Sequence, residues 1–290
     1  MSQNPKLFIG LVTHPKSRFN VRGEANHRIT ELAQNLRENR LTVETFISDR
    51  NDFDEAPQKI GFGIRLRSAW LQAETERVWA KYLDSASDPQ TKVSHLGRFF
   101  YLAMFIRRSI SFLVSSRSLE RLANIDLSHL RVLRAGINSG ADWILVIEDD
   151  GVAENLSEVA TNLELTISFA GIDKSDTFMN LSQSMSEGEL GIEAIMSRPK
   201  EVFPFPDGGK IVEISPPISN TVCANLYSRT FAARFADAIE SQGILPSIPI
   251  DWRLNKLVMN STMTETRCYW VIPGMFIQQS MHENPPNIQG

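Results

Sequence analysis

The chain has 290 residues, of which 42% are hydrophobic and 22% are charged, and its formal net charge is −4. This length and composition allow one large domain or two small ones with a buried core, and the lack of a basic excess argues against a nucleic-acid partner. No stretch reaches the 18 or more uninterrupted apolar residues of a membrane span. We expect a cytoplasmic protein, because the first residues lack the pattern of a signal peptide and the two cysteines, Cys223 and Cys268, are too few for a disulfide framework.

The first 50 residues predict a β-α-β unit. Residues 6–13 (KLFIGLVT) and 41–48 (LTVETFIS) have strand patterns, and residues 25–40 between them carry apolar side chains at helical spacing. Such units cross over with a right hand and make their two strands parallel. Both strands should therefore end at the same edge of one sheet.

Polar residues follow each of these strands. Thr13 and His14 come after the first strand, and Asp49 comes after the second. At the shared edge they can hydrogen-bond a nucleotide base or ribose, although each residue type is also common in turns. The sequence contains neither GxGxxG after the first strand nor GxxxxGK[ST], which argues against a dinucleotide dehydrogenase and a P-loop kinase.

Residues 57–123 predict a mostly helical insertion, which we interpret as a lid or a small subdomain over one face of the sheet. Its most apolar part, residues 99–114 (FFYLAMFIRRSISFLV), predicts a buried helix. Because arginines interrupt and flank this segment, peripheral docking on an anionic membrane is the alternative.

The most informative stretch is residues 142–152, DWILVIEDDGV. Five apolar residues predict a buried strand, and Glu148, Asp149 and Asp150 follow where it should end. Along a strand Glu148 and Asp150 would point one way and Asp149 the other, unless Gly151 turns the chain early. Adjacent carboxylates are best tolerated around a cation, and oxygen ligands suit Mg²⁺ or Mn²⁺. The alternative is a solvated strand-to-loop turn.

The remaining pattern alternates helices and strands. His129 lies in a predicted helix over residues 127–139, where it is either a core or capping histidine or a ligand. Asp251 opens a helix that continues to Val258, either as its N-cap or as a functional carboxylate. We further expect helices over 156–169 and 229–242, the latter capped by Ser228, strands over 177–181, 220–227 and 268–272, and an irregular loop over 199–217.

The order of these parts resembles the GT-A nucleotide-sugar glycosyltransferases, and among them the lipopolysaccharide-type family 25. The resemblance rests on Ser128-His129-Leu130 before a strand that ends in Glu148-Asp149-Asp150, together with the polar end of the first strand and a terminal Gln-x-Ser near a histidine. It covers residues 5–50 and 125–282 and is most specific over 127–152. It implies one α/β domain over residues 1–290, with a mixed, mostly parallel, Rossmann-like sheet flanked by helices and with the helical insertion.

The resemblance also implies roles for individual residues. Asp149 and Asp150 match the metal-binding DxD-type element, with the divalent metal held at Glu148-Asp149-Asp150 and with Glu148 and Asp149 also contacting the nucleotide sugar. Thr13, His14 and Asp49 match positions that hold the nucleoside. Asp251 matches an acidic residue near the acceptor and is the candidate catalytic base, and His282 matches a segment that completes the metal shell.

The function expected from these residues is metal-dependent transfer of a sugar from a nucleotide-sugar donor, with a UDP-sugar favoured, to a hydroxyl of a glycan, lipid-linked or protein acceptor. One alternative is a sugar-nucleotide nucleotidyltransferase, although Thr13-His14-Pro15-Lys16-Ser17-Arg18 lacks the glycines of the phosphate loop in those enzymes. The other alternative is a non-catalytic binding protein with a degenerate GT-A fold.

Overall fold

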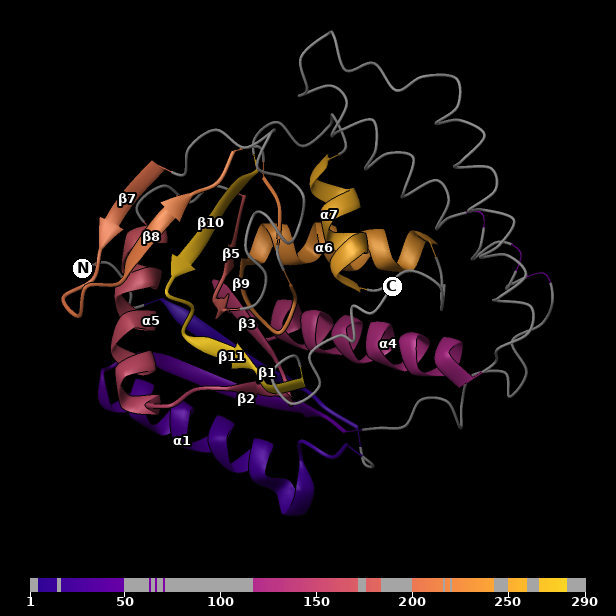
Figure 1. The fold of residues 1–290 in the computed structure, drawn as a ribbon, viewed down its shortest axis with the longest axis horizontal. Coiled ribbons are helices and arrows are strands. Elements are labelled where there is room, and N and C mark those ends of the chain that lie inside the picture. The colour runs from indigo at the N-terminus through magenta and orange to yellow at the C-terminus, as the bar shows by residue number, and fades with distance from the viewer. Residues whose placement is uncertain are drawn as a thin grey trace, which may run out of the picture.

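The structure is a computed structural model that describes residues 5–14, 17–49, 63, 66, 70, 117–171, 176–183, 200–215, 217–219, 221–242, 250–259 and 266–280. These residues form an α/β protein with a mixed eight-stranded sheet in the order β2-β1-β3-β9-β5-β10-β8-β7 (Figure 1). The strands are β1 (Lys6–Val12), β2 (Thr42–Ser48), β3 (Trp143–Glu148), β5 (Thr177–Asn180), β7 (Lys200–Pro204), β8 (Lys210–Glu213), β9 (Ala224–Ser228) and β10 (Arg267–Ile272).

Helices cover both faces of this sheet. α1 (Glu24–Glu38), preceded by the short 3-10 helix η1 (Val21–Gly23), contacts α5 (Leu156–Ala170) on one face. On the other face, α4 (Arg117–Asn138), α6 (Arg229–Gln242) and α7 (Ile250–Met259) contact one another (Figure 1). No helix among the described residues is both long enough and apolar enough to cross a membrane.

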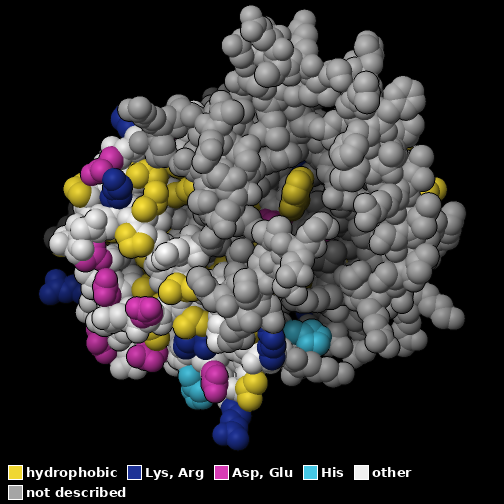
Figure 2. Space-filling view, in the orientation of Figure 1, with side chains coloured by type: hydrophobic (Ala, Val, Ile, Leu, Met, Phe, Trp, Pro, Cys, Tyr) yellow, Lys and Arg dark blue, Asp and Glu magenta, His cyan; other side chains and the backbone are white. Residues whose placement is uncertain are grey.

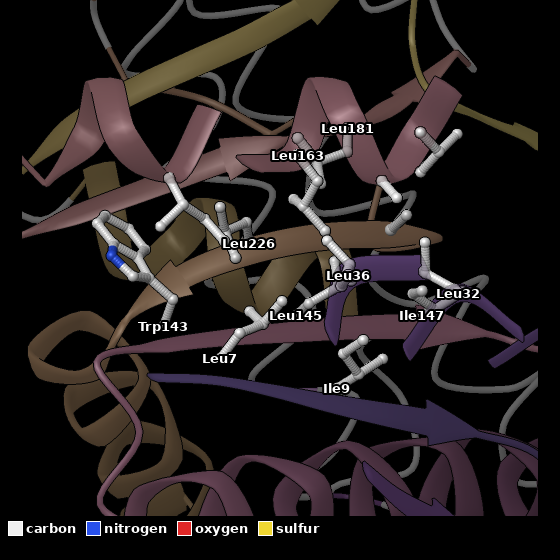
Figure 3. Close-up of a cluster of buried hydrophobic side chains, with 14 of the residues drawn as sticks. Leu7, Ile9, Leu32, Leu36, Trp143, Leu145, Ile147, Leu163, Leu181 and Leu226 are labelled. Carbon is white, nitrogen blue, oxygen red and sulfur yellow. The ribbon is translucent and has the colours of Figure 1, made fainter. Parts of the chain in front are cut away.

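Each face of the sheet has its own hydrophobic core. Alternate residues of the strands point to opposite faces, so that Leu145 and Ile147 of β3 pack under α1 and α5, whereas Ile144 and Val146 pack under α4 and α6. Figure 3 shows the first of these cores, in which side chains from β1, β3, α1, α5 and β9 meet. The buried, branched residues of β3 therefore fit a strand covered on both faces.

The predicted β-α-β unit is confirmed, with β1 parallel to both β2 and β3. The sheet is mixed, as predicted, but it is partly rather than mostly parallel. The pairs β2–β1, β1–β3 and β5–β10 are parallel, whereas β3–β9, β9–β5, β10–β8 and β8–β7 are antiparallel. The prediction of an irregular loop over residues 199–217 was wrong, since β7 and β8 form an antiparallel hairpin there, with Pro204 as the last residue of β7.

Other elements differ from expectation mainly in their limits. The helix predicted over residues 127–139 is the C-terminal part of α4, which begins at Arg117. Ser228 caps α6, as predicted, because its Oγ accepts a hydrogen bond from the backbone N–H of Phe231 at 3.3 Å. Residues 57–116 of the predicted insertion, including the apolar segment 99–114, lie outside the described residues except for 63, 66 and 70, which are helical.

A small second sheet joins the C-terminal segment to the end of β3. It has the order β4-β11-β6, made of β4 (Gly151–Val152), β11 (Phe276–Gln278) and β6 (Ser182–Gln183). β11 pairs antiparallel with β4, so that Gln278 lies opposite Gly151. This sheet brings residues 276–280 next to the acidic turn that follows β3.

Helix α4 packs very closely on β1 and β3, and glycines make this approach sterically allowed. A Cβ atom at Gly10 of β1 would lie 2.0 Å from Cγ1 of Val132, and a Cβ atom at Gly136 of α4 would lie 2.8 Å from Cγ1 of Ile144. Real Cβ atoms are not found at such distances, so the helix would have to move outward if either glycine were replaced. The position of α4 thus depends on Gly10 and Gly136.

We expect Gly10→Ala to lower the free energy of unfolding by about 1 to 3 kcal/mol, because the added methyl overpacks the core. Val132→Ala removes both methyl groups that the new Cβ would meet, so the double variant should lose less than the sum of the two single variants, as measured by urea unfolding. Gly63→Ala is the control, since a Cβ at this exposed helical residue meets nothing within 4 Å. Additive effects of Gly10→Ala and Val132→Ala would contradict this packing.

Candidate active site at the carboxyl edge of the sheet

Three parallel strands end side by side at one edge of the sheet. Val12 of β1 pairs with Ser48 of β2 on one side and with Glu148 of β3 on the other. Thr13, Asp49 and Asp149 are the next residues along each strand, so they lie at one edge, as the sequence predicted for Thr13 and Asp49. This carboxyl edge is where α/β sheets bind ligands.

The carboxylate of Asp149 is held by the end of β1. Its Oδ2 accepts a hydrogen bond from the Thr13 hydroxyl at 2.7 Å, and that hydroxyl accepts one from the Asn20 amide at 3.1 Å. The Asp149 carbonyl oxygen accepts a hydrogen bond from the guanidinium of Arg28 in α1 at 2.7 Å. Thr13 is buried, and its hydroxyl therefore orients Asp149. His14 is partly buried and Asp49 is exposed, at the same edge.

Asp150 is held by the C-terminal segment. Its Oδ2 accepts hydrogen bonds from the Ser280 hydroxyl at 2.5 Å and from the Gln278 amide at 3.4 Å, and its backbone oxygen accepts one from the Gln279 N–H at 2.9 Å. The pKa of Asp150 is raised to about 6, mainly by burial and then by the charge of Glu148, while the hydrogen bonds from Ser280 and Gln278 act in the opposite direction. The chain has thus placed a carboxylate where its ionised form is disfavoured.

Glu148 lies on the α4 face of the sheet. Its Oε1 is 2.9 Å from Nε2 of His129, whose side chain is only 1% exposed, whereas 18% of the Glu148 side chain is exposed. β3 ends at Glu148, and Asp149 and Asp150 form a turn before β4, so the alternation expected of a continuing strand stops there. The three acidic side chains consequently contact three different segments of the chain.

Asp251 lies in the first turn of α7, inside the helix rather than at its N-cap. The pKa of Asp251 is raised to about 6, mainly by burial and in part by the charge of Glu148, while the backbone N–H of Trp252 and the charge of His129 act in the opposite direction. Next to it, Arg253 and Asp126 form a buried ion pair between α7 and α4, with Nη2 and Oδ2 2.8 Å apart but not aligned as a hydrogen bond. Burial also raises the pKa of Asp126, which Arg253 opposes.

The residues expected to bind metal are only partly brought together. Among the described residues, no three His, Cys, Asp or Glu side chains form a group that could hold a metal ion. Asp150 Oδ1 is nevertheless buried and has no hydrogen-bond partner within the described part of the chain. His282 lies outside the described residues. The described chain therefore offers carboxylate ligands at Asp149 and Asp150, but not a complete metal cage.

Several residues of this site were not singled out from the sequence. Asn20, Arg28 and Asp126 carry no local pattern that distinguishes them from surface polar residues. A partial signal existed for Gln278 and Ser280, in the terminal Gln-x-Ser, and for His129, in the Ser-His pair before the strand. Their contacts with Asp150 and Glu148 join residues 130 and 19 positions apart, which no local pattern specifies.

A separate open groove lies beside α5, between the β7–β8 turn and the segment that joins β10 to β11. Acidic side chains gather over this part of the molecule in Figure 2, and Glu154, Glu158 and Asp207 line the groove together with Phe205 and Met275. Its polar groups bond mainly to one another: the Asn162 amide donates to Asp207 at 2.7 Å, and Asn155 caps α5. The groove does not include the carboxylates at the end of β3.

The fold and the site thus define an α/β protein with a mixed, partly parallel sheet and a cluster of carboxylates at its carboxyl edge. Comparison with known protein families finds none that matches the chain, and comparison with curated protein sequences also finds no match.

The wild type and Asp251→Asn should differ in stability by an amount that depends on pH. Since the pKa of Asp251 is raised in the folded state, the protonated side chain contributes to the free energy of unfolding below about pH 4. This contribution is lost as pH rises through about 6. Relative to the wild type, Asp251→Asn should gain roughly 1 to 3 kcal/mol of unfolding free energy between pH 4 and pH 7, as measured by urea denaturation.

Asp207→Asn is the matched control, because the pKa of Asp207 is shifted in the opposite direction to that of Asp251. Hydrogen bonds from Asn162 and from the Gly209 N–H lower the pKa of Asp207, so its contribution is present above the ordinary pKa of an aspartate and is lost at lower pH. Relative to the wild type, this variant should therefore lose stability as pH rises. A constant difference between the wild type and Asp251→Asn across this range would contradict the raised pKa.

Proposed function

We propose that this chain is a metal-dependent glycosyltransferase of GT-A type, which moves a sugar from a nucleotide-sugar donor to an acceptor hydroxyl. The observation that carries the proposal is the meeting of three distant segments at the carboxyl edge of the sheet: the end of β1, the acidic turn after β3 and the C-terminal segment after β11. The charge of Glu148 also acts on Asp251 at the start of α7. The sequence resemblance assigns donor, metal or acceptor roles to these same segments.

The residues at the acidic turn fit a divalent cation. Mg²⁺ is commonly bound by one or two carboxylates together with substrate phosphates, and such a site needs no group of three protein ligands. The free, buried Oδ1 of Asp150 and the oriented carboxylate of Asp149 are the ligands that the described chain would supply to Mn²⁺ or Mg²⁺, with His282 as the expected addition. When bound, the cation would stabilise negative charge on the leaving diphosphate.

The residues of the chain have distinct tasks in this proposal. Ser280 and Gln278 hold one oxygen of Asp150, Thr13 holds Asp149, and Arg28 fixes the carbonyl between them, so the turn keeps its shape without reorganisation. Asp251 is the candidate base that accepts the proton of the acceptor hydroxyl. A carboxylate with a pKa near 6 is mostly ionised at neutral pH and is a stronger base than an exposed aspartate.

The proposed GT-A type also suggests the chemical classes of the donor and of the acceptor. His14 and Asp49 at the edge are proposed to contact the nucleoside, with a UDP-sugar as the favoured donor. The acceptor is proposed to be a glycan, a lipid-linked saccharide or a protein. Transfer to a lipid-linked acceptor would fit a cytoplasmic enzyme that contacts the membrane peripherally through residues 99–114. These residues lie outside the described part of the chain.

A thermal-shift panel tests the proposal. UDP, GDP, CMP and their sugars are each added to the wild type with Mn²⁺, with Mg²⁺ or with EDTA. One nucleotide with metal should raise the Tm by roughly 5 °C at saturating concentration, because a ligand present at 100 times its Kd adds about 2.7 kcal/mol to stability. Asp150→Ala should abolish the metal-dependent part of the shift.

Asp237→Ala is the control, because it removes an exposed carboxylate of α6 that pairs with Arg134. It should keep the full ligand-induced shift. If no nucleotide raised the Tm of the wild type, the carboxylates would be a structural turn, and a non-catalytic binding protein would become the better interpretation. A shift with nucleoside triphosphate and sugar phosphate instead would favour a nucleotidyltransferase.

Turnover should depend on pH through the candidate base. With the donor and acceptor class in hand, kcat should rise with pH and level off above about pH 6, because Asp251 must be ionised to accept a proton. Asp251→Asn should lower kcat by about 100-fold or more, with donor binding retained. A variant with wild-type kcat would remove Asp251 from the reaction.

A further inference from the structure

Helix α7, which carries Asp251, packs on the core through one apolar stripe. Ile250, Leu254 and Val258 follow one another at intervals of four residues, and all three are buried in the core on the α4 face of the sheet. Because hydrophobic contacts are not directional, this stripe alone does not fix the rotation of the helix about its axis. A helix of ten residues also depends on its tertiary contacts to keep its place.

Asn255 holds α7 through both polar atoms of its side-chain amide. Its Oδ1 accepts a hydrogen bond from the backbone N–H of Ser219 at 2.8 Å, and its Nδ2 donates one to the backbone carbonyl of Ser219 at 3.0 Å. Both residues are buried. Two bonds to the backbone of a single residue restrict the amide to one orientation, so they fix the side of α7 that meets Ser219.

Ser219 is itself bonded to the centre of the sheet. The amide of Asn180 in β5 donates a hydrogen bond to the Ser219 hydroxyl at 3.3 Å and another to the carbonyl of Thr221 at 3.1 Å. The Ser219 hydroxyl donates to the same carbonyl at 2.5 Å, and Asn180 and Thr221 are both buried. Asn255 therefore attaches α7 to a buried hydrogen-bond network.

A second polar contact holds the opposite flank of the apolar stripe. Successive residues of an α-helix are about 100° apart, which places Arg253 on one flank and Asp251 together with Asn255 on the other. Arg253 forms its buried ion pair with Asp126 of α4. Asp251 and Asn255 are four residues apart, so they lie one turn apart on the same side of the helix. A rotation that displaced Asp251 would have to break both polar contacts.

We propose that Asn255 is a positioning residue for Asp251, and that its two bonds to Ser219, together with the Arg253–Asp126 pair on the other flank, lock the rotation of α7. The inference rests on the proposed function, in which Asp251 is the base, and Asn255 acts only through Asp251. The lock keeps the Asp251 carboxyl buried, within reach of the charges of Glu148 and His129. A carboxyl free to turn into solvent would ionise at its ordinary pKa and would hold no fixed distance to an acceptor hydroxyl.

The first test needs no substrate. Asn255→Leu keeps a similar side-chain volume and removes both bonds to Ser219. For the wild type and for this variant, the folded-state pKa of Asp251 is obtained from the pH dependence of the unfolding free energy, measured by urea denaturation with and without Asp251→Asn. In Asn255→Leu this pKa should fall from about 6 toward the ordinary value of an aspartate. Val258→Ala is the matched control, because it loosens the same helix through the apolar stripe and should leave the pKa of Asp251 as in the wild type.

The second test uses turnover and a variant of the other flank. The double variant Asp126→Leu/Arg253→Met should stay folded with a Tm near that of the wild type, because apolar residues of similar volume often replace a buried ion pair without loss of stability. Its kcat should nevertheless fall by about tenfold or more, with the KM of the donor within about twofold, because the base is misplaced. Asn255→Leu should show the same split, whereas Val258→Ala should keep kcat within about twofold of the wild type.

The outcomes separate this inference from the proposed function. A wild-type pKa of Asp251 in Asn255→Leu, or an equal fall of that pKa in Val258→Ala, would overturn the positioning role and leave the transferase proposal standing. If Asn255→Leu does not fold, a wild-type kcat in Asp126→Leu/Arg253→Met would overturn the lock. A fall in the pKa of Asp251 in Asn255→Leu alone, with no glycosyl transfer by the wild type, would support the lock and overturn the proposed function.

Discussion

The close packing of helix α4 on strands β1 and β3 decides where the buried polar groups of this protein stand. Gly10 and Gly136 bring the helix so near the sheet that His129 reaches Glu148, and the next turn of the helix places Asp126 beside Arg253. A helix held further out by side chains at these glycines would separate His129 from Glu148. Since a buried charge without a partner costs several kcal/mol, helix placement and charge pairing have to be satisfied together.

The carboxyl edge carries a second constraint, which works against stability. Burial raises the pKa of both Asp150 and Asp251, so at neutral pH the folded chain holds carboxylates that would be more easily ionised in water. Cores on both faces of the sheet compensate for this cost. Carboxylates that a fold keeps in an unfavourable ionisation state are found more often in functional sites than elsewhere.

The sequence predicted those features that depend on neighbouring residues. The apolar run over residues 143–147 specified a strand buried on both faces, and the β-α-β crossover specified which strand ends share an edge. Strand direction beyond this unit was not predictable, because β9 and β8 are antiparallel to their neighbours through pairings of residues far apart in the chain. The β7–β8 hairpin was missed because Pro204, Gly208 and Gly209 look like a loop, although Pro204 is the last residue of β7 and only the glycines lie in the connection to β8.

The candidate site shows the same boundary between local and distant information. The three consecutive acids indicated a candidate site, but only the fold shows that each has a different hydrogen-bond partner. Strand β3 ends at Glu148 and the chain turns at Asp149, so each carboxylate points toward a different element. The rotation of α4 about its axis selects His129 rather than its neighbours for Glu148, and the pairing of β11 with β4 selects Ser280 for Asp150. An acidic motif therefore predicts where carboxylates lie on a sheet edge, whereas the packing of helices and of a small second sheet decides which partner each carboxylate contacts.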